Sequence, residues 1–226
     1  MTKTLSILCR TLLGVLLLAT APAGAQEIYE HFPASVNKDA KYVFYSHGFI
    51  VEGTDPRPVN VAQGWGVYDF PAVKKALADE TYHLIAFHRP KNTDPLAYAT
   101  ELEKQVRTLV EAGVPVRNIT LVGFSRGGFI TGVASSQLSD VGVNSVLLAA
   151  CGGLVSDRFS HIRPSGHMLS IYEKSDRAGS CRDLETRSPD LLSFQEIEIN
   201  TGLSHGAFFR PLPDWVQPLK DWIKSR

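Results

Sequence analysis

Residues 119–128 read Ile-Thr-Leu-Val-Gly-Phe-Ser-Arg-Gly-Gly, an apolar run that passes directly into a G-x-S-x-G pentapeptide, Gly123 to Gly127. The apolar run is typical of a buried strand, and the pattern that follows predicts a helix from about Arg126 to Leu138. A tight strand-to-helix turn holds its serine in a strained backbone conformation with the hydroxyl exposed, and it leaves no room for side chains two residues to either side. We therefore interpret Ser125 as a candidate nucleophile. The alternative is a serine in an ordinary glycine-rich turn.

A serine hydroxyl needs a base, and the base needs an orienting carboxylate. Proteins with this strand-turn-helix serine place the acid and then the histidine in loops after later strands. Asp176 lies a few residues past the strand expected at 168–172, where the loop turns over the sheet. Glu173 and Asp183 compete for the role, but Glu173 is expected at the strand end and Asp183 lies beyond Cys181. The sequence therefore favours Asp176 as the acid.

The candidate base is His205, which follows the strand expected at 194–199 and precedes the closing helix. His161 and His167 come before Asp176 in the chain, so either of them would break the order serine, acid, histidine. Position in this order favours His205.

The anionic intermediate of acyl transfer needs two N–H donors. We expect one to be the backbone N–H of Arg126, the residue after the nucleophile, and the other to be the backbone N–H of Phe49 in the loop that follows the strand at 42–45. Gly48 allows this loop to turn sharply. His47 is interpreted chiefly as a bracing residue of the loop rather than as a catalytic group.

Strand-like apolar runs alternate with helical patterns along the whole chain, which predicts an α/β fold with a mostly parallel sheet of about six strands and helices on both faces. The expected strands are 42–45, 82–87, 119–122, 143–149, 168–172 and 194–199. The last alternates more than the others, as a strand near the sheet edge would. Helices are expected from Pro71, from Pro95 to Gly113, from Arg126 and around Trp215 to Ile223.

Composition narrows the class of function. The chain has 226 residues, 44% of them hydrophobic, and it has 23 basic and 23 acidic residues. No global basic field exists to hold nucleic acid or an anionic membrane. No metal-binding set is apparent, since His83 and His88 lie five residues apart on an expected strand and point to opposite faces. No phosphate-binding glycine loop is present, and we expect no cofactor.

The first 25 residues have the pattern of a secretory signal peptide: basic residues, a short apolar run and small residues at Ala23 to Ala25. The run is too short for a membrane span. We expect cleavage after Ala25, a single domain over 26–226, and secretion or a periplasmic location. The mature chain then keeps Cys151 and Cys181, which we favour as a disulfide over two buried free thiols.

The segments Ser46 to Phe49, Gly123 to Gly128, Asp176 and Ser204 to Gly206 together resemble the α/β-hydrolase family, over about residues 40 to 226. The resemblance implies an eight-stranded sheet, so the two opening strands should be missing or reduced to residues 27–36. About fifteen residues separate Ala150 from Gly166, too few for a helical cap domain. The chain is similar to compact, lid-poor members such as small carboxylesterases and dienelactone-hydrolase-like proteins, although dienelactone hydrolases use cysteine where this chain has Ser125.

The resemblance and the missing cap predict a hydrolase for esters of small acyl groups. Trp65, Arg89 and His47 are candidates to line the substrate pocket, although Trp65 and Arg89 have alternative interpretations, as a packing residue and as a surface ion pair. A thioesterase, a peptidase or an acyltransferase that uses Ser125, Asp176 and His205 in the same way is a close alternative. A catalytically silent binding module on the same fold is the alternative from a different class. The oligomeric state and the leaving group are left open by the sequence.

Overall fold

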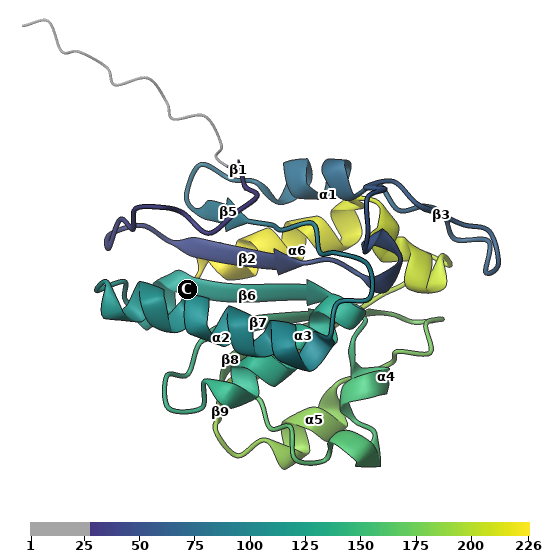
Figure 1. The fold of residues 1–226 in the computed structure, drawn as a ribbon. Helices are drawn as coiled ribbons and strands as arrows, with labels where there is room; N and C mark the ends of the chain where they lie inside the picture. Colours follow the sequence, from purple (N-terminus) through teal and green to yellow (C-terminus); the bar gives the residue numbers. More distant parts are fainter. Residues whose placement is uncertain (1–27) are drawn as a thin grey trace, which may run out of the picture.

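The computed structural model describes residues 28–226, and its centre is a sheet of seven parallel strands (Figure 1). Along the chain these are β1 (Ile28–Tyr29), β2 (Tyr42–Ser46), β5 (His83–Ile85), β6 (Ile119–Phe124), β7 (Asn144–Leu148), β8 (Gly166–Glu173) and β9 (Leu191–Ile199). Their order across the sheet is β1-β5-β2-β6-β7-β8-β9. All six expected strands are present, and the strand predicted near the edge, β9, is an edge strand. The signal peptide predicted at 1–25 lies outside the described residues.

The seventh strand, β1, comes from the segment in which we expected a reduced start of the fold. A separate antiparallel hairpin, β3 (Val59–Asn60) with β4 (Gly66–Val67), stands away from the main sheet in Figure 1. It belongs to the long stretch that follows the loop after β2, and Trp65 lies between its two strands, directly before β4.

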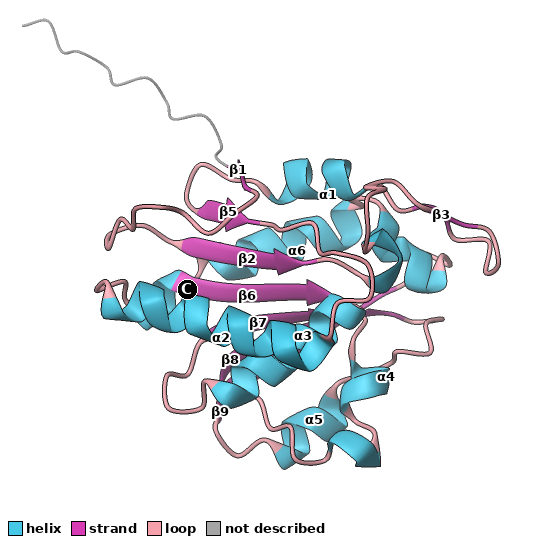
Figure 2. Cartoon of the chain, in the orientation of Figure 1, coloured by secondary structure: helices cyan, strands magenta, loops and turns pink. Residues whose placement is uncertain are grey.

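Helices cover both faces of the sheet (Figure 2). The longer helices are α1 (Phe70–Leu77), α2 (Pro95–Glu111), α3 (Arg126–Gln137) and α6 (Pro213–Lys224). Buried residues of α2 and α3 belong to one hydrophobic cluster, and those of α1 and α6 belong to the other. The side chain of Asp94 accepts hydrogen bonds from the N–H groups of Leu96 and Ala97 and so caps α2, as its Asp-Pro start predicts. The fold class expected from the sequence is confirmed.

Shorter helices connect the elements of the sheet. They are α4 (Cys151–Leu154), α5 (Arg182–Arg187) and the 3-10 helices η1 (Phe49–Val51), η2 (Val116–Asn118), η3 (Asp157–Phe159) and η4 (Ser204–Phe209). Only α4 and η3 lie between β7 and β8, so no helical cap covers this part of the described chain. No helix among residues 28–226 is both long and apolar enough to span a bilayer.

Asp79 anchors the C-terminal helix to the loop between α1 and β5. Its carboxylate lies 3.1 Å from Nζ of Lys220 and 2.8 Å from Nζ of Lys224, and it accepts hydrogen bonds from the N–H and hydroxyl of Thr81. Burial alone would raise the pKa of Asp79, but the hydrogen bonds from Lys224, Thr81 and Lys220 outweigh it and hold the pKa well below its ordinary value. The ionised form is therefore the one that stabilises the fold.

We expect Asp79→Asn to lower the free energy of unfolding at pH 7 by about 1–2 kcal/mol, a figure reduced because Lys224 is partly exposed. The pKa of Asp79 is lower in the folded protein than in the unfolded chain, where it is about 3.9. The stability that its ion pairs contribute is therefore complete above that pH and is lost as the pH falls towards the folded-state pKa. Urea unfolding should therefore show a smaller difference between wild type and variant at pH 3 than at pH 7. Asp39→Asn is the control, because Asp39 and its partner Lys38 are both exposed. An equal effect of both substitutions would contradict this role for Asp79.

Candidate active site

Ser125 sits in a strained turn between β6 and α3. Its backbone has φ 54° and ψ −117°, a conformation that residues other than glycine rarely adopt. Its backbone N–H donates a hydrogen bond to the carbonyl oxygen of Leu148, with the nitrogen 2.9 Å from that oxygen. A Cβ on Gly123 would lie 2.1 Å from the carbonyl oxygen of Gly127. The backbone of the turn therefore leaves no room for a side chain at Gly123, as the motif predicts.

The second glycine of the motif brings the loop after β2 against the serine turn. A Cβ on Gly127 would lie 1.9 Å from the carbonyl oxygen of Ser46, and the oxygen of His47 is also within 2.6 Å of that position. Only a glycine permits this approach of two backbones. The backbone of Ser46 and His47 therefore lies directly against the serine turn, and the candidate donor Phe49 follows two residues later in the same loop.

His205 and Asp176 are in direct contact. Nδ1 of His205 lies 2.6 Å from Oδ2 of Asp176, and the second carboxylate oxygen accepts the N–H of Ala178 at 3.0 Å. Because an ionised carboxylate can only accept, the bond assigns the Nδ1 proton to the imidazole, and Nε2 is then the nitrogen that accepts. The two candidates chosen from chain order are thus hydrogen-bonded to each other.

Ser125 and His205 line the same cavity of about 320 Å³. Its other lining residues are Arg126, Phe129, Ala149, Ala150, Gly152, Gly153 and Ala178. No hydrogen bond joins Ser125 to His205 among the hydrogen bonds of residues 28–226. Bonds of this kind are often long in a site that holds no substrate and shorten when one binds. A second cavity of about 810 Å³ shares His205 and Ala178 with the first and adds Trp65, Asp176 and Arg177.

Trp65 and Phe124 flank the imidazole, with ring centroids 5.1 Å and 4.8 Å from that of His205. Trp65 also fills the space beside Gly206, where an added Cβ would lie 2.8 Å from the Cβ of the tryptophan. Of the three residues expected to line the substrate pocket, Trp65 is the one that lies beside the candidate base and borders a cavity.

The other two expected pocket residues, His47 and Arg89, are buried and border neither cavity. Nδ1 of His47 donates to the carbonyl of Gly48 at 2.8 Å, and Nε2 accepts the backbone N–H of Arg89 at 2.9 Å. Burial, and then the charge of Arg89, hold the pKa of His47 well below its ordinary value, so the ring is neutral. The prediction that His47 and Arg89 line the substrate pocket is therefore corrected. Both side chains are buried beneath the loop after β2 and stabilise it through hydrogen bonds to its backbone or to each other.

Glu173 has a role that the sequence reasoning missed. This buried carboxylate ends β8 and accepts hydrogen bonds from the N–H and hydroxyl of Ser175, and from the N–H groups of Thr201 and Gly202. Burial alone would raise the pKa of Glu173, but these bonds outweigh it and lower the pKa. Glu173 thereby fastens the loop of Asp176 to the loop of His205. Its signal in the sequence is an acidic residue directly continuing a buried strand.

Both candidate oxyanion donors are the first residues of helices. Arg126 is the first residue of α3, where N–H groups have no acceptor within the helix. Phe49 begins η1, and its side chain is 52% exposed. The guanidinium of Arg126 lies over the Phe49 ring, with Cζ 4.7 Å from the ring centroid.

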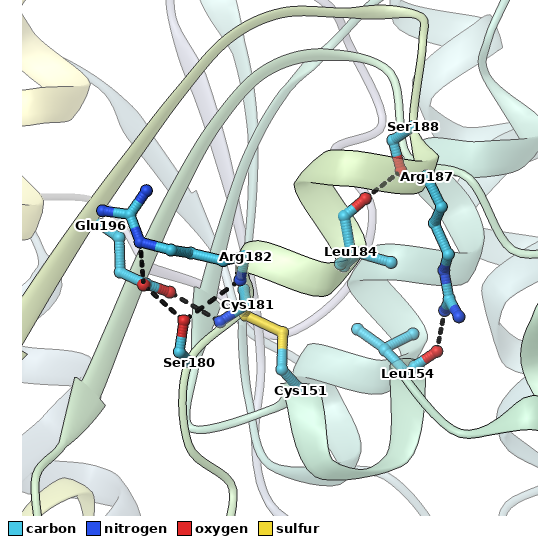
Figure 3. The surroundings of a disulfide bond; sticks show 9 residues. All are labelled: Cys151, Leu154, Ser180, Cys181, Arg182, Leu184, Arg187, Ser188 and Glu196. Carbon is cyan, nitrogen blue, oxygen red and sulfur yellow. Dashed lines mark hydrogen bonds and ion pairs between the residues drawn. A yellow bond between two sulfur atoms is a disulfide. The ribbon is translucent and has the colours of Figure 1, made fainter.

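Cys151 and Cys181 form a disulfide, with Cα atoms 5.2 Å apart (Figure 3). Cys151 is the first residue of the four-residue helix α4, and Cys181 directly precedes α5. Glu196 of β9 accepts the N–H of Cys181 at 2.6 Å and the hydroxyl of Ser180 at 2.7 Å. The bridge closes a separation of 30 residues, for which chain entropy gives at most about 3.6 kcal/mol. It ties the segment after Asp176 to the segment that walls the smaller cavity.

Within residues 28–226, no three His, Cys, Asp or Glu side chains are grouped so as to hold a metal ion. The described cavities are instead bordered by the serine, histidine and acid and by small and aromatic residues.

Several solved structures with a similar fold are described as hydrolases or esterases. An esterase/lipase from an uncultured bacterium has a TM-score of 0.59 and 13% identity, over 82% of this chain and 76% of its own. XC6422 from Xanthomonas campestris, described as an α/β serine hydrolase without lid, has a TM-score of 0.52 and 17% identity, over 85% and 83%. A YdeN-like hydrolase from Pectobacterium atrosepticum has a TM-score of 0.53 and 13% identity, over 88% and 92%.

The protein has the α/β-hydrolase fold, as the resemblance in its sequence implies. No protein-family model matches the chain, and no curated protein sequence matches it. At these identities the likeness to solved structures establishes the fold alone, so the chemistry has to be argued from the residues of this chain.

Proposed function

We propose that the protein is a serine hydrolase that cleaves carboxylic esters of small acyl groups, with Ser125 as nucleophile, His205 as base and Asp176 as orienting acid. The observation that carries the proposal is the 2.6 Å bond between Asp176 and His205 on the cavity that Ser125 also lines. Esterase and hydrolase descriptions among the fold neighbours support it by analogy.

In the proposed reaction His205 takes the proton of Ser125 as its oxygen attacks the ester carbonyl. The backbone N–H groups of Phe49 and Arg126 donate to the oxyanion that forms. His205 then gives the proton to the departing alcohol, and Ser125 is left acylated. Water, deprotonated by the same imidazole, hydrolyses the acyl-enzyme and restores the serine.

A fluorophosphonate probe tests the assignment of the nucleophile. The wild type should become covalently labelled, and Ser125→Ala should not, because the probe reacts with an activated serine hydroxyl. Ser204→Ala is a matched control, since Ser204 lies beside His205 on the larger cavity and has no proposed part in the chemistry. Labelling that persists in Ser125→Ala, or a wild type that is not labelled at all, would contradict the proposal.

The size of the acyl group follows from the smaller cavity. It measures about 320 Å³, and its walls between Ala149 and Gly153 have no cap above them. We expect p-nitrophenyl acetate to be hydrolysed with a kcat/KM at least about 10-fold higher than the palmitate ester, because a long chain would leave most of its apolar surface in water. Steady-state kinetics over a series of chain lengths measures this, and a preference for palmitate would overturn the size assignment.

We also propose that the mature protein is exported. The signal-peptide pattern of residues 1–25 is the reason, and the disulfide between Cys151 and Cys181 supports an oxidising compartment. Amino-terminal sequencing of protein recovered from the periplasm or medium should find Gln26 first; an uncleaved chain retained in the cytoplasm would refute export.

A further inference from the structure

Glu52 carries a buried carboxylate with no hydrogen bond. Its side chain is 2% exposed, and neither of its oxygens has a hydrogen-bond partner among the described residues. Two guanidinium groups approach it: Nε of Arg89 at 3.5 Å and Nη1 of Arg126 at 3.6 Å. A buried charge is costly unless it is paired. The Glu52 carboxylate therefore depends on these two arginines, and its position is tied to theirs.

The first arginine leads from Glu52 to the serine turn. Arg126 directly follows Ser125, and its guanidinium lies between the Glu52 carboxylate and the ring of Phe49. Phe49 and Arg126 are the two residues whose backbone N–H groups we assign to the oxyanion. Their side chains are therefore in contact, and Glu52 holds the guanidinium that joins them.

The second arginine leads from Glu52 into the loop after β2. Arg89 is buried, and its guanidinium donates to the carbonyl of His47 while its backbone N–H donates to Nε2 of the same histidine. Glu52 itself closes η1, because its N–H donates to the carbonyl of Phe49 at 2.9 Å. One carboxylate thus connects the serine turn, the loop of the second donor and the loop after β5.

We propose that Glu52 is a positioning residue that sets the spacing of the Phe49 and Arg126 N–H groups across the oxyanion position. It touches no substrate, since it borders neither cavity beside Ser125 and His205. Its effect should appear where the oxyanion develops and not in ground-state binding. This inference rests on the proposed function, because the two donors matter only if an oxyanion forms.

The test compares Glu52→Gln with the wild type in hydrolysis of p-nitrophenyl acetate. We expect kcat to fall by roughly 10- to 100-fold with KM changed less than about 3-fold, because donors displaced from the oxyanion lose stabilisation only in the transition state. Glu103→Gln is the matched control: Glu103 also pairs with an arginine, Arg107, but on the outer helix α2. A kcat for Glu52→Gln within about 2-fold of the control would overturn the inference.

Arg126→Leu keeps the inference testable if Glu52→Gln folds poorly, and where both variants fold it completes a double-mutant cycle. Arg126→Leu leaves Glu52 paired with Arg89, so this variant should fold, and it should lower kcat by a similar factor. The two effects should be far from multiplicative in the double variant, because both break one link. Fully multiplicative losses would show that Glu52 does not act through Arg126.

Amide hydrogen exchange separates failure of this inference from failure of the proposed function. In Glu52→Gln the backbone N–H groups of residue 52 and Arg89, which donate to the Phe49 carbonyl and to Nε2 of His47, should exchange at least about 10-fold faster than in the wild type, while amides of β6 keep their rates. This readout needs no substrate. A wild type that hydrolyses no ester would sink the proposed function alone, and unchanged exchange at residue 52 and Arg89 would sink the positioning role.

Discussion

Replacing Ser125 by alanine is expected to lower the rate of ester hydrolysis by on the order of 10³-fold or more, because no other hydroxyl occupies the strained turn between β6 and α3. The substitution removes one oxygen and leaves the backbone in place, so urea unfolding should stay close to that of the wild type. Rates are measured with p-nitrophenyl acetate under single-turnover and steady-state conditions.

His205→Ala should cost about as much as Ser125→Ala, and the double variant should cost little more than either alone. The reason is that an alkoxide cannot form without the base, and the base has no task without the nucleophile. Losses that multiply in the double variant would show that the two residues act independently, which contradicts a shared proton transfer.

The second large effect is expected at Asp176. Asp176→Asn should lower kcat by on the order of 10³- to 10⁴-fold, because an amide at 2.6 Å from Nδ1 no longer favours the imidazole tautomer that accepts at Nε2. The fold should survive, since the side chain keeps its size and the contact with the Ala178 N–H.

Asp183→Asn is the control for this prediction. Asp183 was the competing acid after Cys181, and the structure places it on the exposed side of α5. It should retain wild-type kinetics. Loss of activity in Asp183→Asn, with Asp176→Asn still active, would overturn the assignment of the acid.

Much of the fold could be predicted because the long elements carry periodic signals. Six strands and four helices were readable from apolar runs, glycine turns and Asp-Pro or proline starts such as Asp94-Pro95. The strands and α-helices that were missed are β3 and β4, with two residues each, and α4 and α5, with four and six residues. Segments of this length contain less than two helical turns or too few alternations to distinguish them from loops.

Some residues of the candidate site could be predicted from the sequence and others could not. Ser125, Asp176 and His205 were found because each follows a strand in a fixed chain order, and the structure brings the last two into contact. Glu173 was considered only as a competing acid, and Glu52 was not considered at all, since a charged residue in a sequence suggests a solvated surface. Their burial depends on partners 28 to 74 positions away, such as Thr201 and Arg126, which only the folded chain reveals.

The most direct measurement is a crystal structure of the purified protein after reaction with a p-nitrophenyl phosphonate. We expect phosphorus bonded to Oγ of Ser125, a phosphonyl oxygen about 2.7–3.1 Å from the backbone nitrogens of Phe49 and Arg126, and Nε2 of His205 turned to the adduct. Phosphorus on another residue, or His205 turned away from a phosphonylated Ser125, would contradict the proposed mechanism.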